Sequence, residues 1–127
     1  MLILVLWLWC APAIAQSSDY TEIYAHRLQQ LQERIETLRK YVNADKFVDV
    51  RAYIRGPLGE IRRDIAYLAM GLRGEAMKQA KQLGKAIADD LVKLDVAAKE
   101  FNSQKTEDSY LQVKADFNKL LEILPKQ

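Results

Sequence analysis

Histidine and cysteine are almost absent from this sequence, and their scarcity excludes most catalytic and metal-binding arrangements. Among the 127 residues there is one histidine, His26, and one cysteine, Cys10. The di-metal sites of helical bundles need two inward-facing Glu-x-x-His motifs, which one histidine cannot supply. No Ser-His-Asp or Cys-His set, phosphate loop or dinucleotide loop is recognisable either. We therefore expect a protein that is not an enzyme, with no catalytic residue, cofactor or metal site.

His26 leaves one weaker alternative open. On an ideal helix it points away from the apolar stripe formed by Leu28 and Leu31, so we expect it to be solvated. Glu22 lies four residues earlier and could share a weakly held surface metal with it. Two ligands do not close a coordination sphere, so the prediction is an exposed helical pair.

A strong charge of either sign is also missing. The 19 lysines and arginines nearly balance the 17 acidic residues, and the formal net charge is +2. Binding to nucleic acid would need a strongly basic patch accompanied by aromatic stacking residues. We expect neither a nucleic-acid partner nor a small-molecule substrate.

The N-terminal residues have the pattern of a leader. Residues 2–15 are apolar and end in Ala13-Ile14-Ala15, just before polar Gln16. Such a core followed by small residues is typical of a cleaved export signal, and it is shorter than the roughly 20 residues that span a bilayer. No basic residue precedes the core, as in the thylakoid-transfer half of a two-part plastid presequence. We expect cleavage after Ala15, which makes residues 16–127 a single domain.

Two other interpretations of the leader stay open. The apolar run is also compatible with an N-terminal anchor that lies on a membrane. Cys10 invites comparison with a lipidated cysteine, but Trp9 stands where a lipobox has a small residue. Cleavage after Ala15 would remove the cysteine and both tryptophans, leaving no thiol for a disulfide or a metal.

The rest of the chain contains four stretches in which apolar residues recur three or four positions apart, the spacing of a helix with one buried face. We expect helices from Asp19, where Glu22 completes a capping box, from about 44 to Met70, from Glu75 to Phe101, and from the N-cap Thr106 to the stop at Pro125. The connections are short, so sequential helices run antiparallel. The sequence therefore predicts an all-α, up-down-up-down four-helix bundle.

The inward-facing side chains follow from the same spacing. They are Tyr24, Leu28, Leu31, Ile35 and Leu38 in the first stretch, Phe47, Val50, Ile54, Leu58, Ile61, Ile65, Leu68 and Leu72 in the second, Ala76, Ala80, Leu83, Ile87, Leu91, Leu94, Ala98 and Phe101 in the third, and Tyr110, Val113, Phe117, Leu120, Leu121 and Leu124 in the fourth.

Gly56-Pro57 interrupts the second stretch without disturbing its periodicity. Pro57 has no N–H for the carbonyl of Tyr53, and its ring crowds the preceding turn, at a cost of about 3 kcal/mol in a helix interior. Because the apolar side chains stay in phase on both sides, the pattern favours one long helix with a kink over two helices and a loop.

The residues around this kink resemble those of a known family. The run Ile54-Arg55-Gly56-Pro57-Leu58-Gly59, followed by Glu60-Ile61-Arg62-Arg63-Asp64, is similar to PsbQ, the extrinsic lumenal subunit of photosystem II, in its cyanobacterial and algal forms. Residues 90–98 and 110–125 are similar to the third and last helices of that family. The likeness covers most of the chain after the leader.

The resemblance implies a function. It implies a non-catalytic subunit, docked to the lumenal face of photosystem II, that stabilises the oxygen-evolving complex and its retention of calcium and chloride. Its implied partners are the photosystem II core and the other extrinsic lumenal subunits. Its implied location is the thylakoid lumen, peripheral to the membrane, in an algal plastid rather than a cyanobacterium.

Arginines beside the kink are the candidate docking residues. Arg51, Arg55 and Arg62 fall within about 40° of one another on an ideal helical wheel. Like charges four residues apart repel, so acidic groups should face them. One interpretation supplies those acids from within the chain, as Glu33 or Glu36 of the first helix or Asp90 of the third. The other makes the arginines a docking surface for an acidic partner.

The kink has two compatible interpretations. Gly56 and Pro57 either only bend the helix around its neighbours, or Gly56 and Gly59 leave a groove without side chains where the backbone of another subunit can approach. The candidate partner-binding residues are Arg51, Tyr53, Arg55, Gly56, Pro57, Gly59 and Arg62.

Two other functions stay open. One is a PsbQ-like lumenal subunit of the thylakoid NAD(P)H dehydrogenase-like complex, although the intact Gly-Pro-Leu-Gly favours photosystem II. The other is a lumenal or periplasmic four-helix protein that binds metal or acts as a chaperone. Tight metal affinity or an exposed apolar groove would favour the latter.

Overall fold

The computed structural model describes residues 13–125, and side chains from Tyr20 onward. The predicted leader, including Cys10, therefore lies outside the described residues except for its last three positions. The described elements are α1 (Ala13–Asn43), α2 (Phe47–Arg55), α3 (Ile61–Leu68), the short 3-10 helix η1 (Ala69–Gly71), α4 (Gly74–Lys99) and α5 (Ser103–Ile123). Every described element is helical, which confirms the prediction of an all-α fold.

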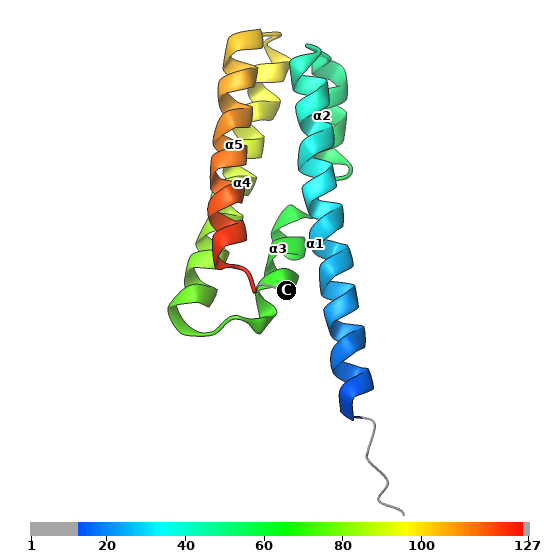
Figure 1. Cartoon of the computed structure of the whole chain (residues 1–127). Coiled ribbons are helices and arrows are strands. Elements are labelled where there is room, and N and C mark those ends of the chain that lie inside the picture. Colours follow the sequence, from blue (N-terminus) through cyan, green and yellow to red (C-terminus); the bar gives the residue numbers. More distant parts are fainter. Residues whose placement is uncertain (1–12, 126–127) are drawn as a thin grey trace, which may run out of the picture.

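The helices run alternately up and down the long axis of the molecule. Figure 1 shows α1 rising, α2 descending behind it and α3 continuing downward between α1 and α4, after which α4 rises and α5 descends beside it. The helices α2 and α3 each pack against both α1 and α4, while α4 and α5 pack against each other and α5 also touches α1. Together α2 and α3 thus occupy the place that the sequence predicts for one helix.

The apolar core lies along the axis between the helices. Most of the predicted inward-facing residues are buried, including Ile35, Ile65, Ile87 and Phe117, each exposing 1% of its surface or less. Other predicted members, such as Leu28, Phe47, Leu72, Leu83 and Leu121, are partly buried against the core. The helical periodicity therefore identified the core correctly, with one exception at Phe101.

The prediction of one kinked helix is wrong, because residues 56–60 are not helical and separate α2 from α3. The Gly56 N–H still donates to the Ala52 carbonyl, but Gly56 then turns to φ −90° and ψ −95°. A residue before proline is disfavoured in the helical region, and Pro57 has no N–H to continue the helix. Leu58 donates instead to the Tyr53 carbonyl and stays buried, so the apolar face continues in phase into α3.

Two predicted helix starts are also wrong. Residues 13–18, ahead of the expected start at Asp19, are already helical in α1, and the sequence from Ala13 to Asn43 contains no glycine or proline that would interrupt the helix. The helix α5 begins at Ser103, where Asn102 is the N-cap and its side chain accepts from the Lys105 N–H at 3.0 Å. Asparagine caps at least as well as threonine, and Thr106 is buried inside the helix.

The two connections at the upper end of the molecule are built alike. Asp45 after α1 and Phe101 after α4 both have positive φ, 52° and 54°. Each N–H donates three residues back, and the following N–H donates five residues back, which is the Schellman pattern of helix ends. Phe101, predicted to be buried, exposes 69% of its surface because it is turned out of α4 by this cap.

The two connections are joined to each other. The Ser103 hydroxyl donates to Asp45 Oδ1 at 2.7 Å, and the ring of Phe101 meets that of Phe47 edge to face at 5.7 Å. Toward the lower end, the Tyr24 hydroxyl donates to the Pro125 carbonyl at 3.1 Å. The first helix is therefore fastened to later parts of the chain at two well-separated heights.

Candidate docking surface

Arg51 and Arg55 of α2 share one carboxylate on α4. Arg51 Nε lies 3.1 Å from Asp95 Oδ1, and Arg55 Nη2 lies 3.2 Å from Asp95 Oδ2. The Asp95 side chain is 20% exposed, whereas that of Arg55 is 64% exposed. One carboxylate thus offsets two guanidinium groups, and the second of these still faces solvent.

The acids expected to pair with these arginines have other neighbours. Glu36 accepts from Lys114 at 3.0 Å, and Glu33 accepts from the Gln29 amide at 3.2 Å. Asp95 was not predicted as the partner of these arginines, because an ion pair between two helices depends on how far one helix is shifted and rotated relative to the other. Those two quantities are not encoded in the spacing within either helix.

Arg62 does not join Arg51 and Arg55 in one stripe. The break at residues 56–60 places it on α3, so a single helical wheel no longer applies. Its side chain is exposed and makes no ion pair within residues 13–125. Of the three predicted arginines, two pair with Asp95 and the third has no ion pair among the described residues.

Tyr53 and the residues of the break occupy different surroundings. Tyr53 faces α1, where its ring lies 5.6 Å from that of Tyr41. A Cβ at Gly59 would lie 2.6 Å from the Arg55 carbonyl oxygen, and one at Gly56 would lie 3.1 Å from that of Ala52. The turn itself therefore requires Gly59, while Gly56 and Pro57 are exposed.

A cluster of cations that was not predicted lies where α3 meets α4. Arg62 and Arg63 on α3 and Lys81 and Lys85 on α4 line a depression of about 340 Å³, which is also lined by exposed Ala66 and by buried Ile65, Ala69 and Gly84. Arg63 pairs with Glu60 at 3.7 Å, but the other three cations have no ion pair among the described residues. We call these four residues the α3–α4 cation cluster. The spacing of Lys78, Lys81 and Lys85 on one flank of a helix was the available signal for it.

Gly84 brings the two sides of this depression together. A Cβ there would lie 3.2 Å from Ile65 Cγ2, so the backbone of α4 passes directly over the Ile65 side chain. The close approach places the arginines of α3 along one bank and the lysines of α4 along the other.

A second depression continues the first toward the upper end. It has a volume of about 410 Å³, and Arg62 and Arg63 line it as well. Its remaining lining is mostly apolar, with Leu58 and Leu91 buried and Val92 62% exposed. The two depressions share Arg62 and Arg63 and follow one another along α3 and the break on one side and α4 on the other, and we call them together the α3–α4 trough.

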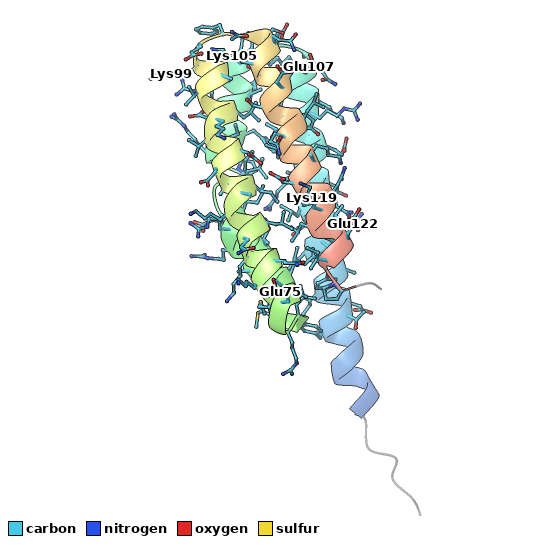
Figure 2. The ribbon with its side chains drawn as sticks, turned by 90° about the vertical axis from the view of Figure 1, so that its left-hand side faces the viewer. Glu75, Lys99, Lys105, Glu107, Lys119 and Glu122 are labelled. Atoms are coloured by element: carbon cyan, nitrogen blue, oxygen red, sulfur yellow. The ribbon has the colours of Figure 1, made fainter. Side chains whose placement is uncertain are left out.

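A third depression, of about 260 Å³, lies between α2 and the end of α4. Exposed Val48 and Phe101 border it, together with Arg51, Arg55 and Lys99. Figure 2 shows Lys99 near the upper end of α4, directed away from α5. This end of the surface combines apolar and basic groups.

Two buried aspartates lie between α4 and α5, away from these depressions. Asp90 and Asp116 each expose 7% of their surface. Burial, reinforced by the Asp116 carboxyl, raises the pKa of Asp90 to about 7. The hydrogen bond from Asp90 lowers the pKa of Asp116. At a pH between these two pKa values, Asp90 therefore keeps its proton while Asp116 is ionised.

Another groove lies between α1 and α3. It has a volume of about 670 Å³ and is lined by Glu22, His26, Arg27 and Arg34 of α1 and, across it, Asp64 of α3, which pairs with Arg34 at 3.5 Å. His26 is exposed, as predicted. No cluster of three or more metal-ligand side chains occurs within the part of the chain that the structure describes. None of the helices in residues 13–125 is long and apolar enough to cross a bilayer.

Comparison with known proteins gives two matches. The PsbQ family profile, described as oxygen evolving enhancer protein 3, matches residues 14–125. A relative named CyanoQ, from the cyanobacterium Synechocystis, is 34% identical over 113 residues, which cover 89% of this chain and 74% of that protein.

Proposed function

This chain belongs to the PsbQ family, and from that membership we propose that it is a non-catalytic extrinsic subunit of photosystem II. In this proposal the protein is peripheral to the thylakoid membrane and docks on the lumenal face of the complex. Docking stabilises the oxygen-evolving complex and helps it retain calcium and chloride. The chain holds no part of the manganese cluster, and its leader, residues 1–15, is removed before it docks.

The observation that carries the proposal is the family match over the whole described fold. Surface charge supports it, because exposed cations exceed carboxylates along the α2, α3 and α4 side of the molecule. Exposed arginine and lysine side chains attract acidic surfaces and form charge-assisted hydrogen bonds to carboxylates. Such contacts are screened by salt, over about 10 Å at 0.1 M.

The test is to tag the C-terminus, solubilise thylakoids gently and identify the complex with which the protein migrates. We expect migration with photosystem II at low salt and release after a salt wash. Membranes depleted in this way should lose oxygen evolution when calcium and chloride are limiting, and the added protein should restore it. Migration with the NAD(P)H dehydrogenase-like complex, or free in all conditions, would overturn the proposal.

A further inference from the structure

Positive charge gathers in the trough between α3 and α4. Four cations, Arg62, Arg63, Lys81 and Lys85, line its two depressions, and Glu60 is the one carboxylate among the lining residues. Glu60 lies beside Arg63, where an exposed pair contributes little. Neighbouring cations repel one another, so the cluster lowers the stability of the isolated protein by a small amount. An anionic partner would remove that cost.

Several other surface cations differ in this respect. Arg51 and Arg55 share Asp95, Lys114 meets Glu36, and Lys105 meets Glu100. Each of these has a carboxylate partner within the fold. Exposed cations without an ion pair among the described residues also occur elsewhere, for example at Lys40 and Lys93, but in the trough three of them face one another across two helices that Gly84 holds in close contact.

The shape of the trough indicates what kind of anion fits. Its floor and upper half are apolar, with Ile65, Leu58 and Leu91 buried beneath and Val92 protruding at the side. An elongated trough with an apolar floor and cationic banks matches a polypeptide segment whose carboxylates alternate with apolar side chains. A lipid headgroup would use the cations but would leave the length and the apolar half of the trough unused.

We infer that the α3–α4 trough is the docking site for an acidic polypeptide segment of the partner complex, with carboxylates on Arg62, Lys81 and Lys85. This inference rests on the proposed function for the identity of the complex. It moves the centre of docking from Arg51 and Arg55 to α3 and the middle of α4.

A charge-removal experiment tests the inference. The full-length mature protein carrying Lys81→Gln and Lys85→Gln is compared with one carrying Lys40→Gln and Lys105→Gln, which removes the same charge from exposed sites on α1 and α5. Binding to salt-washed membranes rich in photosystem II is measured as a function of salt. We expect the first variant to bind about three- to tenfold more weakly and with less salt dependence, as for the loss of two exposed ion pairs, and the second to bind as wild type.

The outcomes separate the two proposals. If wild type does not bind these membranes, the proposed function fails. If wild type binds and both variants bind equally well, the trough is not the docking site. Circular dichroism and thermal unfolding of both variants exclude misfolding as the cause of weak binding.

Carbodiimide crosslinking provides a direct readout, because it joins a lysine amine to a carboxylate in contact with it. We expect crosslinks from Lys81 or Lys85 to aspartate or glutamate in a partner polypeptide, and none from Lys40 or Lys105. Vesicles containing phosphatidylglycerol are the alternative probe. Binding to them that depends on Lys81 and Lys85, without such crosslinks, would replace the acidic segment with a lipid surface and overturn the inference.

Discussion

The pair α2 and α3 and the pair α4 and α5 contain the same apolar periodicity but use it differently. The helices α4 and α5 are long, continuous and packed along their length, with Ile87, Val113 and Leu120 fully buried. The helices α2 and α3 are nine and eight residues long and are separated by a turn. Short helices with this periodicity depend on packing against longer neighbours, because isolated helices of this length are marginal in water.

The difference extends to the charges that flank α4. Beside α2, Asp95 of α4 forms ion pairs with two arginines of α2. Beside α3, no carboxylate of α4 forms an ion pair with Arg62 among the described residues, and Lys81 and Lys85 of α4 add further positive charge. The less continuous side of the fold, α2 and α3, therefore faces paired charges of α4 at one end and unpaired cations of α4 at the other.

Truncating one leucine in each region should give the largest effect. Leu120 in α5 and Leu58 in the turn are both buried, exposing 0% and 2% of their surface. Leu→Ala costs about 2–5 kcal/mol, depending on how far the surroundings collapse. We expect the loss in the free energy of unfolding, measured with urea, to be close to the largest value of this range for Leu120→Ala and close to the smallest for Leu58→Ala. Equal losses would show that the turn is as rigid as the paired helices.

Adding one methyl group to the turn should give the next largest effect. Gly59→Ala places a Cβ against the Arg55 carbonyl oxygen, which is backbone and cannot rotate away. Overpacking of this kind costs about 1–3 kcal/mol. Gly71→Ala is the matched control, since its Cβ would make only ordinary contact with Pro125 at 3.6 Å. A neutral Gly59→Ala in thermal unfolding would show that the turn opens easily.

The aspartate pair makes the stability of α4 and α5 depend on pH. The pKa of Asp90 is about 7 in the folded protein, while an unfolded aspartate has a pKa of about 4. Between these values the folded state keeps a proton that the unfolded state has lost, so stability falls as pH rises and levels off above about pH 7. The lowered pKa of Asp116 has the opposite effect, and its contribution is lost only at lower pH.

Asp90→Asn should therefore flatten the stability curve between about pH 4 and pH 7. Urea unfolding at several pH values within this window measures the slope. Asp89→Asn is the control, because Asp89 is exposed on the same helix and should leave most of the slope in place. A slope that survives Asp90→Asn would assign the proton to another group.

Replacing the proline should give the smallest effect. Were Pro57 inside a helix, Pro57→Ala would be stabilising, but the proline occupies a turn and is exposed. There its ring mainly restricts the unfolded chain, so its loss should destabilise by about 0.4–1 kcal/mol. Differential scanning calorimetry of the isolated protein measures this change. A higher melting temperature for Pro57→Ala would mean that α2 and α3 can merge into one helix.

The sequence predicted the core well and the helix ends poorly, for a physical reason. Burial follows the 3.6-residue period, which survives the turn because Leu58 stays buried in phase. Helix ends depend on competing local signals, as when Asn102 caps four residues before Thr106. At Phe101 a bulky side chain adopts a backbone conformation that usually belongs to glycine, and no sequence rule favours this.

The arrangement of the candidate docking residues was predicted only in part. Arg51, Arg55 and Arg62 were proposed from their spacing on one wheel. Asp95, which pairs with the first two, and Lys81 and Lys85, which lie near the third, come from a helix distant in sequence. Their juxtaposition depends on how α4 is rotated against α2 and α3, and that rotation is fixed by packing at sites such as Gly84.

The tie between the two upper connections has a consequence for the order of folding. The helices α4 and α5 are adjacent in sequence and meet through a very short connection, so their pairing closes a small loop and should form early. The bond between Ser103 and Asp45 spans 58 residues and can form only once both helical pairs exist. Contacts absent from the transition state act on unfolding. We therefore expect this tie, together with the Phe47 and Phe101 rings, to set how long the assembled protein stays folded rather than how fast it folds.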